Sequence, residues 1–141
     1  MQDAAATARH AIEEVCSGRR PDDLDRCYSR SFVDHVNGME FRGHAGARES
    51  IALYRRVFPD LRFTVEQQVT DGDRVATHWT MHGTNHGRSV TLPGITISRF
   101  EDGRIAEDWS YSDSIAIVRQ LGLWRTLLVA AREWRTLLKR S

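Results

Sequence analysis

The strongest constraint on the fold is the segment 94–113, where two alternating strands flank a Glu-Asp-Gly sequence at 101–103. We expect a β-hairpin there, with a three-residue loop in which Gly103 takes the positive φ that a bulged loop requires. The second strand runs into residues 113–122, which start with a polar residue and end at a glycine, as short helices do. A hairpin that leads directly into a helix, with carboxylates near its end, predicts a small α+β domain with its chemistry at that end.

Residue patterns elsewhere place helices before strands. Helical spacing predicts helices over 3–17, 21–27 and 45–58, and alternation predicts extended segments over 32–36, 62–70, 74–84, 89–100 and 104–112. The sequence has no alternation of strands with helices, no P-loop and no Gly-x-Gly-x-x-Gly motif. We therefore expect an α+β domain in which a curved antiparallel sheet wraps around N-terminal helices and encloses a pocket.

Length, charge and cysteine usage limit the classes of function. The 141 residues suffice for one domain, which we place at 1–141. A formal net charge of +1 provides no general attraction to nucleic acid. The chain has no apolar leader and no segment of the ~20 apolar residues that span a membrane, so we expect a cytoplasmic protein. Cys16 and Cys27 form no Cys-x-x-Cys pair, and we expect two free thiols.

Short motifs in a fixed order carry a family resemblance. They are Phe32-Val33-Asp34-His35, Phe41-Arg42-Gly43, Phe58-Pro59-Asp60-Leu61, Gly83-Thr84-Asn85-His86-Gly87 and the run from Phe100 to Trp109. Together they resemble the SnoaL-like polyketide cyclases, a group within the nuclear-transport-factor-two-like superfamily. The resemblance covers a core over residues 5–122.

The resemblance implies a cone-shaped α+β barrel with an apolar cavity, to which an extra C-terminal helix is added. It also implies intramolecular aldol cyclisation of an aromatic polyketide ester, with neither a metal nor an organic cofactor. In the anthracycline cyclases of this group, a His in the third strand and an Asp in the last strand transfer the protons. Aligned on residues 102–105, those two positions hold Thr96 and Ser110 in this chain. The chain also lacks several residues of the family loop that follows segment 83–87.

Three functions remain open after these substitutions. The first is a cofactor-free cyclase, isomerase or lyase that transfers protons on a bulky apolar carbonyl compound. The second is an epoxide hydrolase, although the water-activating Asp of that related group also aligns near Ser110. The third is a non-catalytic protein that binds a small apolar ligand or serves as an accessory subunit.

Strand alternation makes Asp108 the leading catalytic candidate. A three-residue loop pairs Thr96 with Asp108 and puts Ser98 and Ser110 on the same side of the hairpin. In the family geometry that side lines the cavity, so Thr96, Ser98 and Ser110 are candidates for binding substrate. A carboxyl group in an apolar cup has a raised pKa and can act as a general acid or base.

Histidines supply possible partners for this carboxyl group. His35 follows a segment that resembles the rim of the family cavity, and His78 lies in the middle of a predicted strand. His78, His82 and His86 are spaced by four residues, which on a strand separates neighbours by ~13 Å. That distance is too long for one ion, so we expect no metal site.

Further candidates come from aromatic residues and from a strand–helix junction. Tyr54, Trp79 and Phe32 have the character of core residues, and in a hollow domain such residues also form the pocket wall. Asp113 stands where the last strand meets a helix. It can cap that helix or contact substrate, and both interpretations stay open.

The alternation that turns Thr96 inward also predicts an apolar outer patch. Its members are Ile95, Ile97, Ile105, Trp109 and Tyr111. Five large apolar side chains in one patch rarely stay exposed on a monomer, so we expect them to pack against a second subunit in a homodimer or under the C-terminal helix.

Residues 123–139 form an amphipathic helix. Its apolar stripe contains Trp124, Leu127, Leu128, Ala131, Trp134 and Leu138, and four basic residues lie elsewhere on the helix. We expect the stripe to pack on its own domain or across a dimer. A basic amphipathic helix can also lie on a membrane surface, and that alternative stays open.

Overall fold

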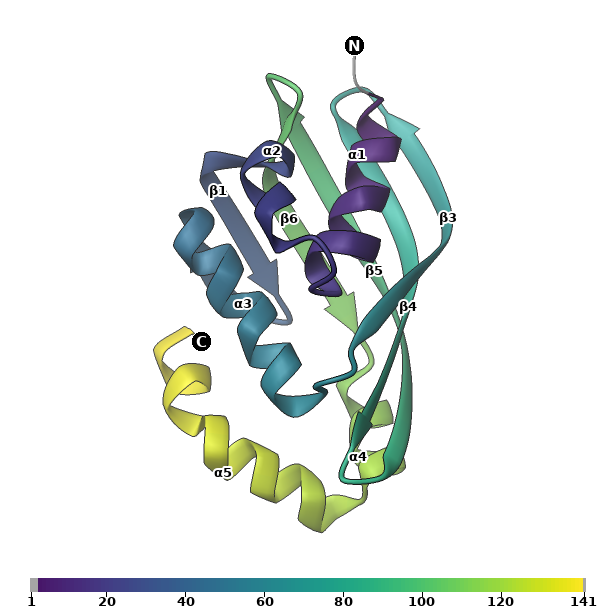
Figure 1. Ribbon diagram of the computed structural model, residues 1–141, viewed down its shortest axis with the longest axis vertical. Helices are drawn as coiled ribbons and strands as arrows, with labels where there is room; N and C mark the ends of the chain where they lie inside the picture. Colours follow the sequence, from purple (N-terminus) through teal and green to yellow (C-terminus); the bar gives the residue numbers. More distant parts are fainter. Residues whose placement is uncertain (1–2, 141) are drawn as a thin grey trace.

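The computed structural model describes residues 3–140. Four short helical segments come first: α1 (Ala4–His10), η1 (Ala11–Cys16), η2 (Pro21–Asp23) and α2 (Leu24–Cys27). Strands β1 (Tyr28–Val36) and β2 (Met39–Arg42) lead to the helix α3 (Gly43–Val57). Strands β3 (Arg62–Asp71), β4 (Arg74–Asn85), β5 (Arg88–Glu101) and β6 (Arg104–Ser112) follow, and α4 (Ser114–Leu121) and α5 (Leu123–Arg140) end the chain (Figure 1).

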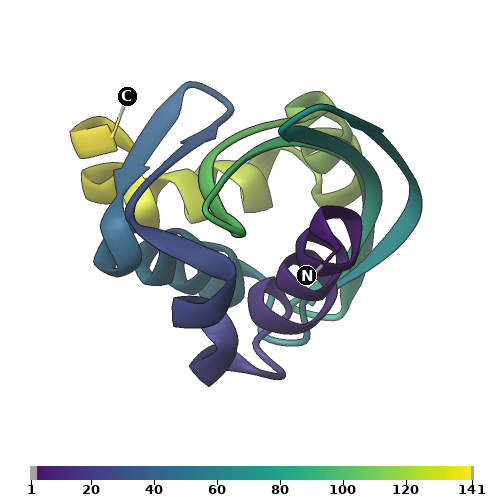
Figure 2. The same ribbon diagram turned by 90° about the horizontal axis from the view of Figure 1, so that it is seen from above.

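Within residues 3–140, six strands form one open, curved sheet in the order β2-β1-β6-β5-β4-β3. All neighbours are antiparallel except β1 and β6, which are parallel. Figure 2 shows the sheet curving around the N-terminal helices. The predicted α+β fold, with a curved sheet wrapped around helices and an added C-terminal helix, is confirmed.

The β5–β6 hairpin differs in detail from the expected one. Its loop has two residues, Asp102 and Gly103, both with positive φ (51° and 75°), as in the tight turns that match strand twist. A bulge next to Phe100 then shifts the register, so that Thr96 pairs with Ser110 rather than with Asp108.

The bulge has different consequences on its two sides. On the side of the bulge away from the loop, the strand register differs from the expected one by two residues. Because side chains alternate with a period of two, Thr96 and Asp108 keep the predicted face. On the loop side the alternation is reversed, so Ile105 is buried among α2 and β1 residues. The expectation that Ile105 belongs to the outer patch is wrong, because a bulge moves one residue to the other face.

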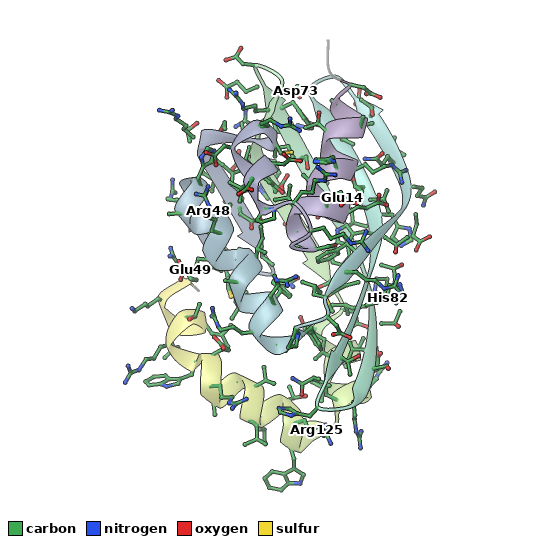
Figure 3. The ribbon with its side chains drawn as sticks, viewed as in Figure 1. Glu14, Arg48, Glu49, Asp73, His82 and Arg125 are labelled. Carbon is green, nitrogen blue, oxygen red and sulfur yellow. The ribbon has the colours of Figure 1, made fainter. Side chains whose placement is uncertain are left out.

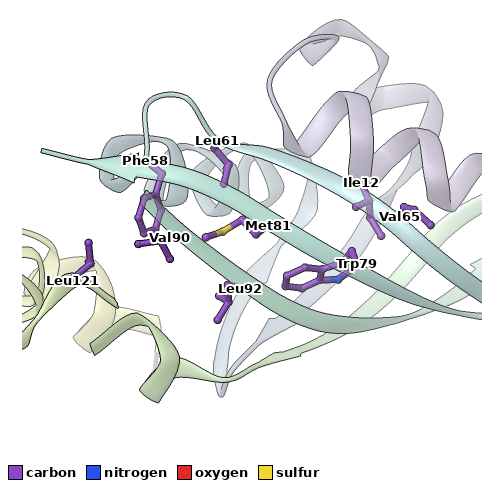
Figure 4. Close-up of a cluster of buried hydrophobic side chains, with 9 residues drawn as sticks. All are labelled: Ile12, Phe58, Leu61, Val65, Trp79, Met81, Val90, Leu92 and Leu121. Carbon is purple, nitrogen blue, oxygen red and sulfur yellow. The ribbon is translucent and has the colours of Figure 1, made fainter. Parts of the chain in front are cut away.

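The core fills the space between the concave face of the sheet and the helices. One cluster joins η1, the α3–β3 connection, strands β3, β4 and β5, and α4, through Ile12, Phe58, Leu61, Val65, Trp79, Met81, Val90, Leu92 and Leu121 (Figure 4). A second cluster joins the N-terminal helices to β1, α3 and β6. The two clusters leave room between them for a cavity.

Helix α5 crosses one end of the molecule and is held by polar contacts. Arg125 at its start donates to the carbonyl oxygen of His86 at 2.8 Å, Glu133 pairs with Arg56 of α3 at 2.8 Å, and Arg140 pairs with Glu49 of α3. Figure 3 labels Arg125 on α5 and Glu49 on α3. None of its residues is buried. Among residues 3–140, no helix combines the length and apolar character needed to cross a membrane.

The expected docking of the α5 stripe on its own domain is wrong. The stripe faces solvent, with exposed fractions of 80% for Trp124, 65% for Leu128 and 52% for Trp134. The side of α5 that is turned toward the rest of the domain carries Glu133, and the hydrogen-bonded pair of Glu133 with Arg56 of α3 orients the helix.

Candidate active site

A cavity of about 90 Å³ lies between the concave face of the sheet and helices η1 and α3. Most of its wall is apolar, formed by residues such as Ile12, Phe32, Phe63, Met81 and Leu92. Polar groups gather on the part of the wall built by β1, β6 and α3. The cavity is therefore an apolar cup with one polar side, which is the usual form of a small-molecule site.

Two carboxyl groups lie side by side on that polar wall. Asp34 of β1 and Asp108 of β6 are register partners on adjacent parallel strands, and both line the cavity. Asp34 points inward because it shares a strand face with Phe32 and Val36, which are buried. Asp108 is only 6% exposed, whereas Asp34 is partly exposed, so Asp108 is the more completely withdrawn from water of the two.

Burial raises the pKa values of the two carboxyl groups by different amounts. It raises the pKa of Asp34 from 3.8 to about 6, although a hydrogen bond with Ser50 counteracts part of the effect. Burial raises the pKa of Asp108 well above 3.8, the neighbouring charge of Asp34 raises it further, and a hydrogen bond with Ser98 opposes both effects. The pKa of Asp108 is therefore raised more strongly than that of Asp34, so Asp108 is the carboxyl group of the pair that holds its proton to higher pH.

One oxygen of Asp108 has no hydrogen-bond partner. Oδ1 is fully buried and makes no hydrogen bond with any other group of residues 3–140. A buried polar atom without a partner is costly, and in native proteins it usually marks a place where a ligand or water completes the site.

A chain of hydrogen bonds links Trp79, Thr96 and Ser110 in the part of the cavity wall built by β4, β5 and β6. Trp79 Nε1 donates to Thr96 Oγ1 at 2.8 Å, and Thr96 Oγ1 lies 2.8 Å from Ser110 Oγ. The Trp79 ring lies so close to Gly94 that a β-carbon at that position would collide with it. The glycine thus allows the indole to lie flat against β5 and form part of the wall.

The rim of the cavity is tied together by Asn37. Its side chain donates to Ser112 Oγ at 2.9 Å and accepts from Ser112 N at 3.0 Å, which links the end of β1 to the end of β6. Tyr54 of α3 lies nearby and is hydrogen-bonded to Asn37, and burial raises the pKa of its hydroxyl to about 12. Tyr54 is therefore a neutral hydrogen-bonding group at working pH.

Both cysteines are free thiols, as predicted. Cys16 lines the cavity, and its Sγ lies 3.7 Å from the Tyr28 hydroxyl. Burial raises the pKa of Cys16 to about 12, so it is not a ready nucleophile. Within residues 3–140, no cluster of three His, Cys, Asp or Glu has the arrangement of a metal site.

Most of the candidate residues predicted from the sequence meet in this cavity. Its wall includes Phe32, Tyr54, Trp79, Thr96, Asp108 and Ser110. Ser98 is buried directly behind the wall, 1% exposed, and is hydrogen-bonded to Asp108.

Three other candidates lie outside the cavity. His35 is on the convex face of the sheet, where its Nε2 is 2.8 Å from Glu107 Oε1 and its ring stacks on Trp109. His78 also lies on the convex face, in a shallow depression beside Ile95. Both point outward because their strand neighbours point inward.

Asp113 forms the N-cap of α4. Its carboxylate accepts from Ile115 N at 3.0 Å and from Ala116 N at 3.3 Å. The capping interpretation of this residue is thus confirmed, and the side chain does not line the cavity.

Asp34, Ser50 and Asn37 belong to the site but were not predicted from the sequence. A signal for Asp34 was present, since alternation through Phe32 and Val36 places it on the buried face. Ser50 and Asn37 carried no such signal, because α3 and the β1–β2 turn approach the cavity only through tertiary packing.

Comparisons with known proteins agree with this architecture. The chain matches the SnoaL-like polyketide cyclase family over residues 6–121. IdmH from Streptomyces antibioticus shares 26% identity at a TM-score of 0.77, with 86% of this chain and 100% of that chain covered. A loop-truncation variant of IdmH shares 28% identity at a TM-score of 0.77, with 85% of this chain and 100% of that chain covered.

A SnoaL-like polyketide cyclase from Agrobacterium tumefaciens is similarly related. It shares 28% identity at a TM-score of 0.73, with 86% of this chain and 100% of that chain covered. A search of curated proteins finds no match. Because the family match spans most of the sequence and includes the cavity-forming strands, the chain belongs to the SnoaL-like polyketide cyclase family.

Proposed function

We propose that this protein is a cofactor-independent enzyme that transfers protons on a small, apolar, carbonyl-bearing compound of polyketide type. The reaction class is an intramolecular aldol cyclisation or a related isomerisation. The observation that carries the proposal is the buried pair of Asp34 and Asp108, whose environments raise their pKa values by different amounts inside an apolar cavity. Such pairs divide the tasks of base and acid between two carboxyl groups.

Asp34 is the proposed general base. With a pKa of about 6 it is mostly ionised at neutral pH and is still basic enough to accept a proton from the carbon next to a carbonyl group. The electron pair left on that carbon passes into the carbonyl group and forms an enolate. The apolar walls exclude water, which would otherwise solvate the base and compete for the enolate.

Asp108 is the proposed hydrogen-bond donor. Burial and the neighbouring Asp34 raise the pKa of its carboxyl group, which favours the protonated form, and in that form it can donate to the developing enolate oxygen. The enolate carbon then forms a bond with a second carbonyl carbon of the same molecule, and Asp34 returns its proton to the new alkoxide. No atom or electron is taken from a cofactor in this sequence, and the enzyme ends in its starting state.

Thr96 and Ser110 are the proposed positioning groups. In related cyclases a His and an Asp occupy these positions, whereas here two hydroxyl groups are linked to each other and to the Trp79 indole. They can orient a carbonyl or hydroxyl group of the substrate but cannot act as bases at neutral pH. The acid–base function would therefore have moved to Asp34 and Asp108.

The proposal is tested by deuterium exchange at the α-carbon of a bicyclic aryl ketone such as α-tetralone, followed by NMR in D₂O. We expect exchange by the protein, and a loss of about 10²–10⁴-fold in Asp34→Asn. Asp60→Asn is the control, since Asp60 is a surface carboxylate bonded to Thr84 N. If α-tetralone binds in the cavity and no exchange occurs, the protein is a ligand-binding protein and the proposal fails.

A further inference from the structure

Helix α5 presents an apolar strip to solvent. The strip is the part of the α5 stripe that consists of Trp124, Leu127, Leu128, Ala131 and Trp134, whose spacing places them on one side of the helix. The large members are between 50% and 80% exposed. An apolar strip with two tryptophans on a surface helix marks a site of interaction with another surface.

The orientation of this strip is set by contacts on the other side of α5. Glu133 receives two hydrogen bonds from the Arg56 guanidinium, at 2.8 and 3.1 Å, and Arg140 pairs with Glu49. These contacts hold the helix against α3. The strip is turned away from the domain and stays available.

Positive charge lies along one edge of the strip. Arg132, Arg135 and Lys139 are exposed, and within residues 3–140 none of them forms an ion pair. Glu133 is the one acidic residue of α5, and it is engaged by Arg56 on the opposite side. The outward half of α5 is therefore both apolar and cationic, with no negative charge to balance it.

We infer that α5 docks the protein on the surface of an anionic lipid bilayer. The strip would lie at the boundary between headgroups and acyl chains, with Trp124 and Trp134 in the interfacial layer. Arg132, Arg135 and Lys139 would contact lipid phosphates, where each adds to the binding. Charge decides against a second copy of α5 as the occupant, since two such helices would bring like charges together.

The position of α5 relates this docking to the cavity. Leu137, on the side turned toward the domain, lines a groove with Met39 and Ile117, and that groove shares Asn37 and Ser112 with the active-site cavity. A lipid-bound α5 would bring this groove, which α5 itself lines, close to the bilayer, where apolar compounds concentrate. The docking itself does not depend on the proposed reaction, because it is argued from α5 alone.

The test is co-sedimentation of the full chain with vesicles of phosphatidylcholine, with and without phosphatidylglycerol. We expect binding to the anionic vesicles, weak binding to the neutral ones, and a decrease as salt is added. Replacing three charges in Arg132→Gln/Arg135→Gln/Lys139→Gln should weaken binding to anionic vesicles by about 100-fold. Leu128→Glu/Trp134→Glu should abolish it.

A matched control removes the same charge elsewhere on the molecule. Arg20, Arg62 and Arg104 are exposed, lie outside α5 and form no ion pair within residues 3–140, and their joint replacement by Gln should change vesicle binding by less than about threefold. Melting curves check that each variant is folded.

Three results would overturn the inference. The first is a full chain that does not sediment with anionic vesicles. The second is a control variant that loses as much binding as the α5 charge variant. The third is a strip variant that changes from dimer to monomer while vesicle binding is unchanged, since a second copy would then be the partner of the strip.

Discussion

At the scale of single residues, the raised pKa of a buried carboxyl group affects both its use as a base and the stability of the folded state. A buried Asp with a raised pKa holds its proton more tightly in the folded state than in the unfolded chain. The folded state therefore gains from protonation at low pH and loses that gain as the pH rises through about 6. An ionised Asp34 is useful to a reaction and unfavourable for folding.

Replacing Asp34 with Asn should therefore stabilise the protein at pH 7. The shift from 3.8 to about 6 corresponds to on the order of 2–3 kcal/mol in the free energy of unfolding. The gain should shrink between pH 6 and 4, because wild-type Asp34 becomes protonated in the folded state over that range. Urea unfolding at several pH values measures it.

Asp60→Asn provides the comparison for this stability series. The Thr84 hydroxyl and backbone N–H hold the pKa of Asp60 below its usual value, so its contribution is present at neutral pH and lost on acidification. Its replacement should slightly destabilise the protein at pH 7. Equal stabilisation by both replacements would contradict the assignment of a buried, raised-pKa Asp34.

Thr96→Val tests the hydrogen-bond chain in the wall. The substitution keeps the shape of the side chain but leaves the buried Trp79 Nε1 without its acceptor. We expect a loss of about 1–3 kcal/mol in unfolding free energy. Thr80→Val, on the solvent side of the same sheet where Thr80 bonds Glu66, should change it by less than about 0.5 kcal/mol.

At the scale of elements, the hairpin shows what sequence can and cannot predict. Alternation placed Thr96, Asp108 and Ser110 on the correct face because side-chain period in a strand is fixed by the backbone. It did not predict the bulge beside Phe100, whose position depends on how β6 meets β1. A bulge leaves no clear local pattern, and Ile105 was consequently assigned to the wrong face.

The part of the site that lies on strands could be predicted from the alternation of side chains. Phe32, Trp79 and Asp108 could be assigned to the pocket from their strand positions, and the same rule applied to β1 and β4 would have turned His35 and His78 outward. The pairing of Asp34 with Asp108 could not be predicted, because it requires knowing that β1 and β6 are parallel neighbours.

The cap of α4 provides a prediction at this scale. Asp113→Ala removes an acceptor for two backbone N–H groups and should lower the free energy of unfolding by about 0.5–2 kcal/mol. Proton exchange on α-tetralone should stay near the wild-type rate, since Asp113 does not line the cavity. A large loss of exchange with unchanged stability would assign Asp113 a role in the reaction.

Removal of α5 should have a small effect on stability. A chain that ends at Gly122 loses no buried residue. It loses ion pairs such as Arg56–Glu133, each worth less than about 1 kcal/mol, and the half-buried contact of Leu137 beside Met39 and Ile117. We expect the melting temperature to fall by only a few degrees, as measured by calorimetry or circular dichroism. A truncated chain that fails to fold would show that α5 packs more tightly than its exposed side chains indicate.

At the scale of the whole molecule, the convex face of the sheet remains a candidate for self-association. Ile95 and Tyr111 are 48% and 60% exposed there, next to the half-buried Ile97 and Trp109. We predict a homodimer through this face, and Tyr111→Lys should convert it to a monomer in light scattering. Ala52→Lys, at an exposed position of α3 away from the convex face, should leave the dimer unchanged, and a monomeric wild type would refute the prediction.

Three surfaces of different chemical character lie on separate parts of the molecule. The concave face of the sheet forms the cavity, the convex face carries the apolar patch, and the outward side of α5 carries the apolar strip with its basic edge. Changes on one of these surfaces should therefore leave the other two properties unaffected.

The most direct test of the account is a carboxyl NMR titration of Asp34 and Asp108 in the folded protein, assigned with Asp34→Asn and Asp108→Asn. We expect Asp34 to titrate near pH 6 and Asp108 to titrate at a higher pH than Asp34. If both carboxyl groups instead titrate near 4, as exposed aspartates do, they are not the separated acid–base pair on which the proposed chemistry depends.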